Sequence, residues 1–258
     1  MLKPKNLTTM RDVALALSSG GARGLAHIGA IEELEQQGYR IRSVAGCSMG
    51  ALVGGMYAAG RLAEFKEWMQ TVDRRKMLSL LDLSLSINHL VKGEKVIDAL
   101  KEIVPDVAIE DLPVEYQAIA TDWKNGREVV FSKGSLYEAI RASISMPLFF
   151  DPVKKGGTTF VDGGILNPLP LNISKDMPGD IVVAVNVSGT GEDNENQNEN
   201  PDGVGLLVIV VARRTGCKLF YHEPTAVPPD GTEECCPQHR AIQARHPGEY
   251  PHGPLRAV

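Results

Sequence analysis

The feature that most constrains this chain is the sequence Gly46-Cys47-Ser48-Met49-Gly50, which has the form G-x-S-x-G. A short apolar run over residues 41–45 precedes it, and a run of small residues with helical character over 49–59 follows it. A strand that turns this sharply into a helix leaves little room beside the serine and presents its hydroxyl at the helix N-terminus. The pattern predicts a nucleophilic Ser48, although the same spacing also occurs in ordinary tight turns.

A glycine-rich loop follows the first predicted strand. Residues 13–17 form a buried apolar run, the sequence Ser18-Ser19-Gly20-Gly21-Ala22-Arg23-Gly24 follows, and residues 25–37 have helical spacing that ends at Gly38. Such a loop leaves backbone N–H groups free at a helix N-terminus, where they can bind an anion. That anion can be the oxyanion that forms during acyl transfer.

An acidic residue occupies a comparable place further along the chain. The predicted strand at residues 160–161 leads into Asp162-Gly163-Gly164, and Asn167-Pro168-Leu169-Pro170 follows. An acid at a strand end, followed by two glycines, is held where a loop opens onto a site.

In this order the three segments resemble the patatin-like phospholipase family, and the match is close to its small bacterial members. The resemblance covers roughly residues 13–187 and includes Arg141-Ala142-Ser143-Ile144-Ser145-Met146-Pro147. It implies that Ser48 is the nucleophile and Asp162 its partner in a Ser-Asp dyad. The remaining implied site positions are an oxyanion hole (Gly20, Gly21, Ala22 and Arg23) and motif glycines (Gly24, Gly46, Gly50, Gly163 and Gly164).

The resemblance also implies a three-layer α/β/α fold with a mainly parallel central sheet, no metal and no cofactor. The implied activity is the hydrolysis of lipid carboxylic esters, of phospholipase A or lysophospholipase type, with transient contact to a membrane surface. One departure is visible, because the family's first loop usually opens with glycine or Asp-Gly, whereas this chain has Ser18-Ser19. Serine there raises the question of strain in the turn.

Composition narrows the class of protein. With 258 residues, the chain is long enough for one α/β domain with a substantial core, and its 43% apolar and 23% charged content is ordinary for a globular protein. A net charge of -5 argues against nucleic-acid binding, which normally needs a basic stripe. No apolar run has the length of a signal peptide or a membrane span, so we expect a cytoplasmic protein that associates at most peripherally with membranes.

The remaining pattern predicts several further elements. Helices are expected over 61–76 and 94–104, and a hairpin over 116–120 and 127–131 around Asn125-Gly126. A capping box at Ser135 to Glu138 should start a helix that ends before Pro147, and the last clearly patterned strands are expected at 160–161 and 181–187. Residues that could line an acyl chain, or equally belong to an ordinary core, are Met146, Leu148, Phe149 and Phe150.

The C-terminal fifth differs from the rest of the chain. We expect a patatin-like domain over 8–190, an acidic, Asn-rich loop over 191–203 and an atypical tail over 204–258 that adds little to the core. After residue 200 the chain holds eight of its sixteen prolines and three of its four cysteines, unlike the closing helices of the family. A disordered tail specific to this lineage, or a change of reading frame after about Gly205, would each account for this composition.

Three other functions fit parts of the sequence. Ser48, Asp162 and His222 follow the chain order of an α/β-hydrolase triad, although no predicted strand leads to His222. A glycine-rich strand-to-helix loop also binds nucleotides, but the lysine-serine pair of a P-loop is missing here. A catalytically silent lipid-binding or regulatory protein of the same fold is the third alternative. Cys47, beside Ser48, is expected to be a packing residue.

Overall fold

The computed structural model describes residues 11–72, 94–147, 149–188 and 207–211. The strands are β1 (Arg11–Leu17), β2 (Tyr39–Cys47), β3 (Glu115–Asp122), β4 (Arg127–Phe131), β5 (Val153–Lys155), β6 (Thr158–Asp162), β7 (Ile181–Asn186) and β8 (Leu207–Val211). The α-helices are α1 (Ala26–Gln36), α2 (Met49–Ala58), α3 (Leu62–Thr71), α5 (Glu94–Ile103), α6 (Leu136–Ser143) and α7 (Leu171–Ser174). Three 3-10 helices complete the described elements: η1 (Gly21–Leu25), η2 (Ile109–Asp111) and η3 (Gly163–Ile165).

All described strands belong to one sheet, in the order β5-β6-β3-β2-β1-β7-β8, with β4 paired to β3. The centre of the sheet, β3-β2-β1-β7, is parallel, and the outer strands pair antiparallel. Parallel neighbours need crossover connections, and helices supply them here, as expected for the α/β class.

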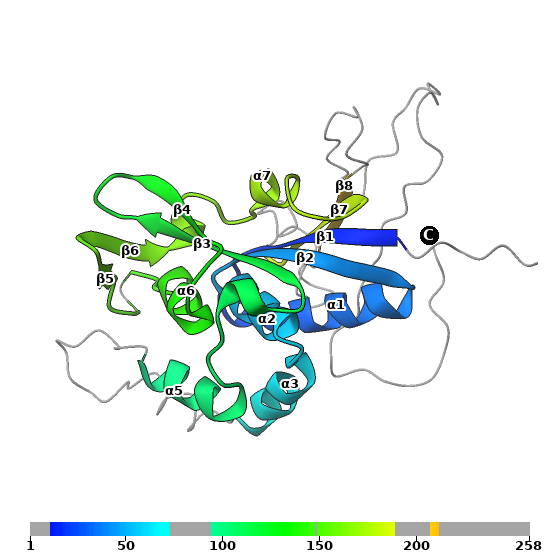
Figure 1. Ribbon diagram of the computed structural model, residues 1–258, viewed down its shortest axis with the longest axis horizontal. Coiled ribbons are helices and arrows are strands. Elements are labelled where there is room, and N and C mark those ends of the chain that lie inside the picture. The colour runs from blue at the N-terminus through cyan, green and yellow to red at the C-terminus, as the bar shows by residue number, and fades with distance from the viewer. Residues whose placement is uncertain (1–10, 73–93, 148, 189–206, 212–258) are drawn as a thin grey trace, which may run out of the picture.

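Helices cover both faces of the sheet (Figure 1). On one face α1, α2 and α6 lie against the strands, with α3 and α5 further out, and on the other face lies the short helix α7. Side chains of β1 alternate between the two layers: Leu15 and Leu17 enter the large core under the helices, whereas Ala14 and Ala16 face α7. The fold is therefore the three-layer α/β/α arrangement expected from the sequence.

Most locally encoded elements are where the sequence predicts them. Gly126 has φ +58° in the β3–β4 hairpin and Gly38 has φ +79° just after α1, as their turn and cap positions require. The Ser135 hydroxyl caps α6 by accepting from the Glu138 amide at 3.1 Å. The Glu138 carboxylate instead accepts from Lys155 Nζ at 2.6 Å, so the capping box has only its serine half.

The structure adds one strand to those expected from the sequence. Strand β8 follows the predicted strand at 181–187 and pairs antiparallel with β7, from Val182 opposite Val211 to Asn186 opposite Leu207. Residues 207–211 are all Leu, Val or Ile, which favour strands, but the composition of the tail as a whole, rich in proline, did not indicate an ordered element. Several predicted features lie outside the described residues: the last residues of the helix expected over 61–76, Leu148, the loop 191–203, the tail other than 207–211, and His222.

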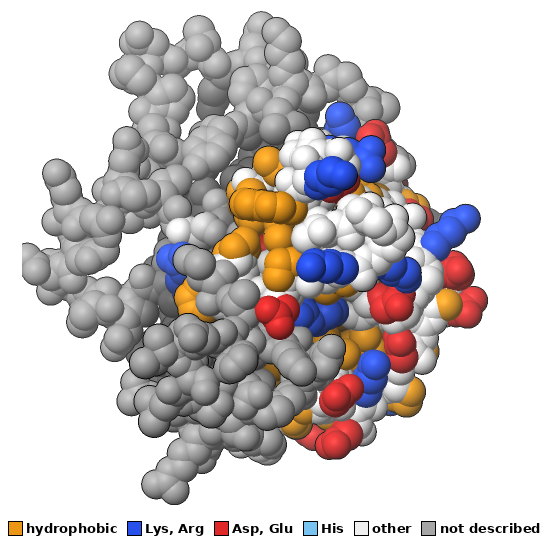
Figure 2. Space-filling view, turned by 90° about the vertical axis from the view of Figure 1, so that its left-hand side faces the viewer, with side chains coloured by type: hydrophobic (Ala, Val, Ile, Leu, Met, Phe, Trp, Pro, Cys, Tyr) orange, Lys and Arg blue, Asp and Glu red, His pale blue; other side chains and the backbone are white. Residues whose placement is uncertain are grey.

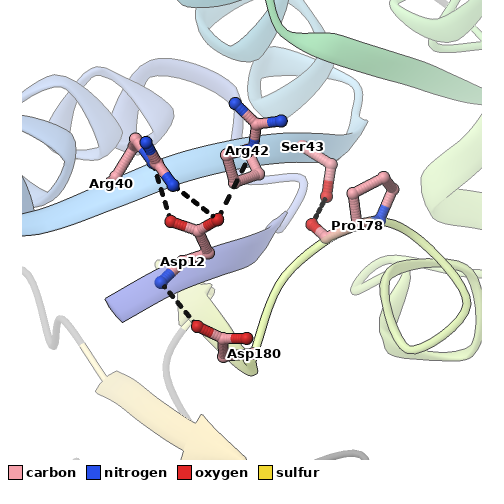
Figure 3. Close-up of polar contacts among 6 residues, drawn as sticks. All are labelled: Asp12, Arg40, Arg42, Ser43, Pro178 and Asp180. Atoms are coloured by element: carbon pink, nitrogen blue, oxygen red, sulfur yellow. Dashed lines mark hydrogen bonds and ion pairs between the residues drawn. The ribbon is translucent and has the colours of Figure 1, made fainter. Parts of the chain in front are cut away.

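The amino end of the parallel strands is tied by ion pairs (Figure 3). Arg40 of β2 donates to both carboxylate oxygens of Asp12 at 2.7 and 2.9 Å, and Arg42 lies 3.6 Å from the same group. The hydrogen bond from Arg40 holds the pKa of Asp12 below its ordinary value. This cluster fixes β1 against β2 at the end of the sheet remote from Ser48.

Candidate active site

Ser48 occupies a strained turn between β2 and α2. Its φ of 54° and ψ of -121° make it the one non-glycine residue with positive φ in the described ranges. A Cβ at Gly46 would lie 2.4 Å from the Gly50 carbonyl oxygen, and a Cβ at Gly50 would lie 2.4 Å from the Leu17 carbonyl oxygen. Both contacts are with backbone, so side chains are excluded at the two flanking positions, as the G-x-S-x-G spacing predicts.

Strand β3 brings Ser48 and Asp162 together. Cys47, the last residue of β2, pairs with Ile119, and Asp162, the last residue of β6, pairs with Ala120, the next residue of β3. Strand β4 holds the opposite edge of β3, so β2 and β6 end against each other on one edge. The Ser48 hydroxyl donates to Asp162 Oδ2 at 2.6 Å.

Asp162 is fully buried and its carboxylate is fixed on both sides. Oδ2 accepts from Ser48, and Oδ1 accepts from the Gly164 amide at 2.7 Å. The Asp162 amide donates to the Ser145 carbonyl oxygen at 2.9 Å, and a Cβ at Gly163 would lie 2.3 Å from the Ile119 carbonyl oxygen. Burial raises the pKa of Asp162, against the opposing effect of its hydrogen bonds from Ser48 and Gly164, which makes it a stronger base than an ordinary carboxylate.

Ser143 is a site residue whose role the sequence did not indicate. Its buried hydroxyl donates to the Ile119 carbonyl oxygen at 2.6 Å and accepts from the Ser48 amide at 2.9 Å. The Ser48 amide is thereby engaged and is not free to bind an oxyanion. The only sequence signal was that Ser143 lies in the segment before Pro147 that resembles the family.

The glycine-rich loop packs against both halves of the Ser48–Asp162 pair. A Cβ at Gly24 would lie 2.2 Å from Cγ of Met49, and a Cβ at Gly164 would lie 3.2 Å from Cβ of Ser19. Neither Ser18 nor Ser19 has positive φ, so the two serines do not strain the turn in that way. Ser18 instead accepts from the Val187 amide at 3.0 Å and donates to the Ser19 carbonyl oxygen at 2.8 Å.

The four amides that were predicted to bind an oxyanion differ in their partners. Those of Gly20, Gly21 and Ala22 have no acceptor among the described residues, whereas the Arg23 amide donates to the Gly20 carbonyl oxygen at 3.2 Å. Gly21 has φ +54°, which favours glycine, and a Cβ at Gly20 would lie 2.3 Å from Cγ2 of Val187. Within the described part of the chain, three N–H groups of the loop are thus without an acceptor, whereas the Arg23 amide is engaged within the loop.

Two other reactive side chains close to the loop are buried. The Cys47 thiol has no exposed surface, and burial raises its pKa, so it stays protonated at neutral pH. His27 is also completely buried in α1. Over the residues that the structure describes, no group of three His, Cys, Asp or Glu side chains is placed to hold a metal ion.

Comparison with known proteins identifies relatives in bacteria and animals. An uncharacterized NTE family protein of Mycobacterium tuberculosis is 49% identical over 177 residues, which are 69% of this chain and 49% of that protein. Human patatin-like phospholipase domain-containing protein 6 is 32% identical over 186 residues, and the match covers 69% of this chain and 14% of that protein. Neuropathy target esterase sws of Drosophila melanogaster is 30% identical over 186 residues, covering 69% of this chain and 13% of that protein.

The chain therefore matches half or less of the length of these relatives. Among solved structures, VipD from Legionella pneumophila aligns with 61% of this chain and 46% of its own, at 16% identity and a TM-score of 0.47. The sequence model of the patatin-like phospholipase family matches residues 15–174, which include the glycine-rich loop, Ser48, Ser143 and Asp162. The resemblance seen in the sequence is confirmed: this chain belongs to the patatin-like phospholipase family.

Proposed function

We propose that this chain is a lipid acyl hydrolase that cleaves carboxylic esters with Ser48 as nucleophile and Asp162 as general base. The observation that carries the proposal is the 2.6 Å hydrogen bond from the Ser48 hydroxyl to a fully buried carboxylate. A serine hydroxyl becomes an effective nucleophile when an adjacent base removes its proton during attack. The family membership and the names of the animal relatives, a phospholipase-domain protein and an esterase, support the same reaction class.

The reaction has two steps. Ser48 Oγ attacks the ester carbonyl while its proton passes to Asp162 Oδ2, and the tetrahedral intermediate then expels the alcohol, which takes up that proton. A water molecule next attacks the acyl-Ser48 ester while Asp162 accepts its proton. The second tetrahedral intermediate then releases the fatty acid, and Asp162 returns the proton to Ser48 Oγ. We assign the Gly20, Gly21 and Ala22 amides, which have no acceptor among the described residues, as donors to the negative oxygen of both tetrahedral intermediates. A strong donor of this kind contributes roughly 3 to 4 kcal/mol.

Direct contact between Ser48 and Asp162 favours a dyad over a Ser-Asp-His triad. In a triad an imidazole stands between the serine and the acid, but here Oδ2 of Asp162 accepts directly from Ser48 and Oδ1 is held by Gly164. A nucleophilic serine with its base in place also makes a catalytically silent lipid-binding protein the weaker alternative.

A substrate panel on the purified chain tests the proposal. We expect hydrolysis of short p-nitrophenyl esters and of lysophospholipid or diacyl phospholipid, and the ratio of these rates assigns the lysophospholipase or phospholipase A type. Ser48→Ala should lose all but a few per cent of turnover on every substrate, whereas His222→Ala should retain it. A Ser48→Ala variant that keeps its activity, or an equal loss in His222→Ala, contradicts the dyad.

We also propose that the end of the sheet that carries the site touches a membrane surface. Exposed apolar side chains follow the strand ends here: Trp123 after β3 is 61% exposed, Phe149 before β5 is 65% exposed and Leu166 after β6 is 47% exposed. Phe149 therefore faces outward and does not line a buried acyl site. Figure 2, which views this side, shows a hydrophobic area with Lys and Arg side chains, and also acidic side chains, beside it.

Charge at the same end suits anionic lipid. The Trp123 amide donates to the Thr159 carbonyl oxygen on β6, and Thr159 pairs on its other side with Lys154 of β5. Trp123 and Lys154 therefore lie on the two sides of β6, and the exposed Lys124 is next to Trp123 in sequence. Within the described ranges, no helix has the length and apolar character to cross a membrane. Trp at a lipid interface and Lys near anionic headgroups are both favourable.

Vesicle co-sedimentation measures this contact. Trp123→Ala combined with Phe149→Ala should weaken binding to vesicles of mixed phosphatidylcholine and phosphatidylserine at least several-fold, while turnover of a soluble short-chain ester is unchanged. Val107→Ala is the matched control, because Val107 is 37% exposed but lies beside the start of α6, away from the site. Equal binding by the double variant and the control rejects this surface.

A further inference from the structure

His27 is a buried polar side chain that the proposed reaction does not use. It lies in the first turn of α1 with no exposed surface. Nε2 is 2.8 Å from the Ser18 carbonyl oxygen, and Nδ1 has no partner among the described residues. Burial lowers the pKa of His27 to about 4, so the ring is neutral at physiological pH. Because a carbonyl oxygen can only accept, the proton of the neutral ring lies on Nε2, which donates to Ser18.

The Ser18 carbonyl stands where the glycine-rich loop leaves β1. Its oxygen faces the elbow as well as His27, since a Cβ at Gly50 would lie 2.5 Å from it. On the other side of the same peptide, the Ser19 amide donates to the Pro168 carbonyl oxygen at 2.8 Å, in the segment that follows Asp162. The peptide between Ser18 and Ser19 is therefore held between the helix after Ser48 and the loop after Asp162, with His27 supplying the hydrogen bond to its carbonyl.

We propose that His27 is a positioning residue that aims the amides of Gly20 and Gly21 at the oxyanion. This inference rests on the proposed function, since it concerns the same acyl transfer. Rotation of the Ser18–Ser19 peptide is the motion that would turn the next amides of the loop away from Ser48. The bond from His27 Nε2 opposes that rotation from a side chain that touches neither substrate nor nucleophile.

The proposal predicts a loss in kcat with little change in KM. Oxyanion contacts form in the tetrahedral transition state and not with the planar ester, so a misplaced amide costs rate and leaves ground-state binding unchanged. Removal of one direct donor costs roughly 10² to 10³ in kcat in known enzymes. A misorientation of the amides caused by the loss of the His27 hydrogen bond should lower kcat by less than the removal of a donor does. We therefore expect kcat to decrease by about tenfold or more.

Two substitutions separate positioning from packing. His27→Leu fills a similar volume without a donor, whereas His27→Gln retains an N–H group that can reach the Ser18 carbonyl. We expect His27→Leu to lose about tenfold or more in kcat and to bind a trifluoromethyl ketone, which mimics the tetrahedral intermediate, more weakly by a similar factor. His27→Gln should recover most of both.

Equal kcat in wild type and His27→Leu overturns the inference, and so does a loss shared equally by the leucine and glutamine variants. If His27→Leu does not fold, the ring ¹⁵N shifts of His27 in the wild-type protein decide. An Nε2-protonated ring whose shifts move when the trifluoromethyl ketone binds supports the inference, and an Nδ1-protonated ring, or shifts that do not move, overturns it. Fluorophosphonate labelling of Ser48 tests the dyad separately, so rejection of the His27 role leaves the proposed function standing.

Discussion

At the scale of single residues, the burial of Asp162 makes its carboxylate a stronger base and lowers the stability of the fold at neutral pH. Its carboxylate is removed from water, so ionisation costs free energy in the folded protein, and its pKa is raised. The folded state therefore binds a proton more tightly than the unfolded chain does. The stability that this proton confers is fully present below the unfolded pKa and is lost as pH rises through the folded pKa. At neutral pH the ionised Asp162 is thus a net cost to the fold.

Asp162→Asn should therefore raise Tm at pH 7 while it abolishes ester turnover, since the amide removes a buried charge but cannot accept a proton. Each unit of pKa shift corresponds to about 1.4 kcal/mol, or roughly 3–6 °C in a domain of this size. Asp12→Asn is the control of opposite sign, because Arg40 lowers the pKa of Asp12 and its charge stabilises the fold at neutral pH. Thermal unfolding of both variants checks the prediction, and a lower Tm for Asp162→Asn at pH 7 contradicts it.

The same shift fixes the direction of the pH dependence of activity. Only ionised Asp162 can accept the Ser48 proton, so kcat/KM should fall as pH decreases through the raised pKa, at a midpoint above the ordinary value of 3.8. A pH-rate profile on a short neutral ester measures that midpoint. A midpoint at or below 3.8 would count against Asp162, and a midpoint near 6.5 that disappears in His222→Ala would indicate a histidine base.

Gly50 is a position in the turn at which a side chain would collide with backbone. In Gly50→Ala the new Cβ would meet the carbonyl oxygens of Leu17 and Ser18 at 2.4 and 2.5 Å, and neither can move without shifting β1 or the glycine-rich loop. We expect a loss of about 1–3 kcal/mol in stability and a large loss of activity. In Gly60→Ala, a control with positive φ and open space, only the strain of about 1–2 kcal/mol should appear, with full turnover. Equal activity in the two variants would contradict the close approach.

At the scale of elements, the sequence predicted what short-range patterns encode. Ser48 was predicted by two flanking glycines, the hairpin by Asn125-Gly126 and the start of α6 by the Ser135 cap, because each of these signals acts within a few residues. The pairing of β6 beside β2 on one edge of β3, and the Ser143 bond to the Ser48 amide, join residues about a hundred positions apart. No local spacing records such contacts, so they could not be predicted.

The pairing of β8 with β7 leads to a prediction about the C-terminal residues. It covers the outer edge of β7, and β7 in turn supports the glycine-rich loop through Ser18, whose amide donates to the Val185 carbonyl oxygen at 3.0 Å. A chain that ends at residue 206 should therefore have a lower Tm and lower turnover than one that ends at Val211, although both lack residues 212–258. Thermal melts and ester assays on the two chains compare them directly. Identical behaviour would support the original expectation that the tail adds little to the core.

At the scale of the whole molecule, the candidate site combines segments that are far apart in sequence at one end of the sheet. The glycine-rich loop follows β1, Ser48 follows β2, Asp162 ends β6 and Ser143 ends α6. The parallel strands β1 and β2 direct their carboxyl ends to a common edge, where binding sites of open α/β sheets usually lie. Strand β6 runs antiparallel to β3, and Asp162 reaches the same place because it pairs with Ala120, next to the partner of Cys47. The Asp12–Arg40 ion pair joins β1 to β2 at the opposite end of the sheet (Figures 1 and 3). The proposed chemistry therefore lies at one end of the sheet, and this stabilising ion pair lies at the other.

Trapping the acyl-enzyme shows whether Ser48 is the nucleophile and whether its reaction needs Asp162. Tryptic cleavage after Arg42 and Arg61 releases a peptide of residues 43–61 that holds Ser43, Cys47 and Ser48. After rapid mixing with a p-nitrophenyl ester and acid quenching, we predict that this peptide gains one acyl mass, that fragmentation places it on Ser48, and that Asp162→Asn gains none. An acyl group on Cys47 or on any other peptide, or rapid turnover with unmodified Ser48, would contradict the dyad.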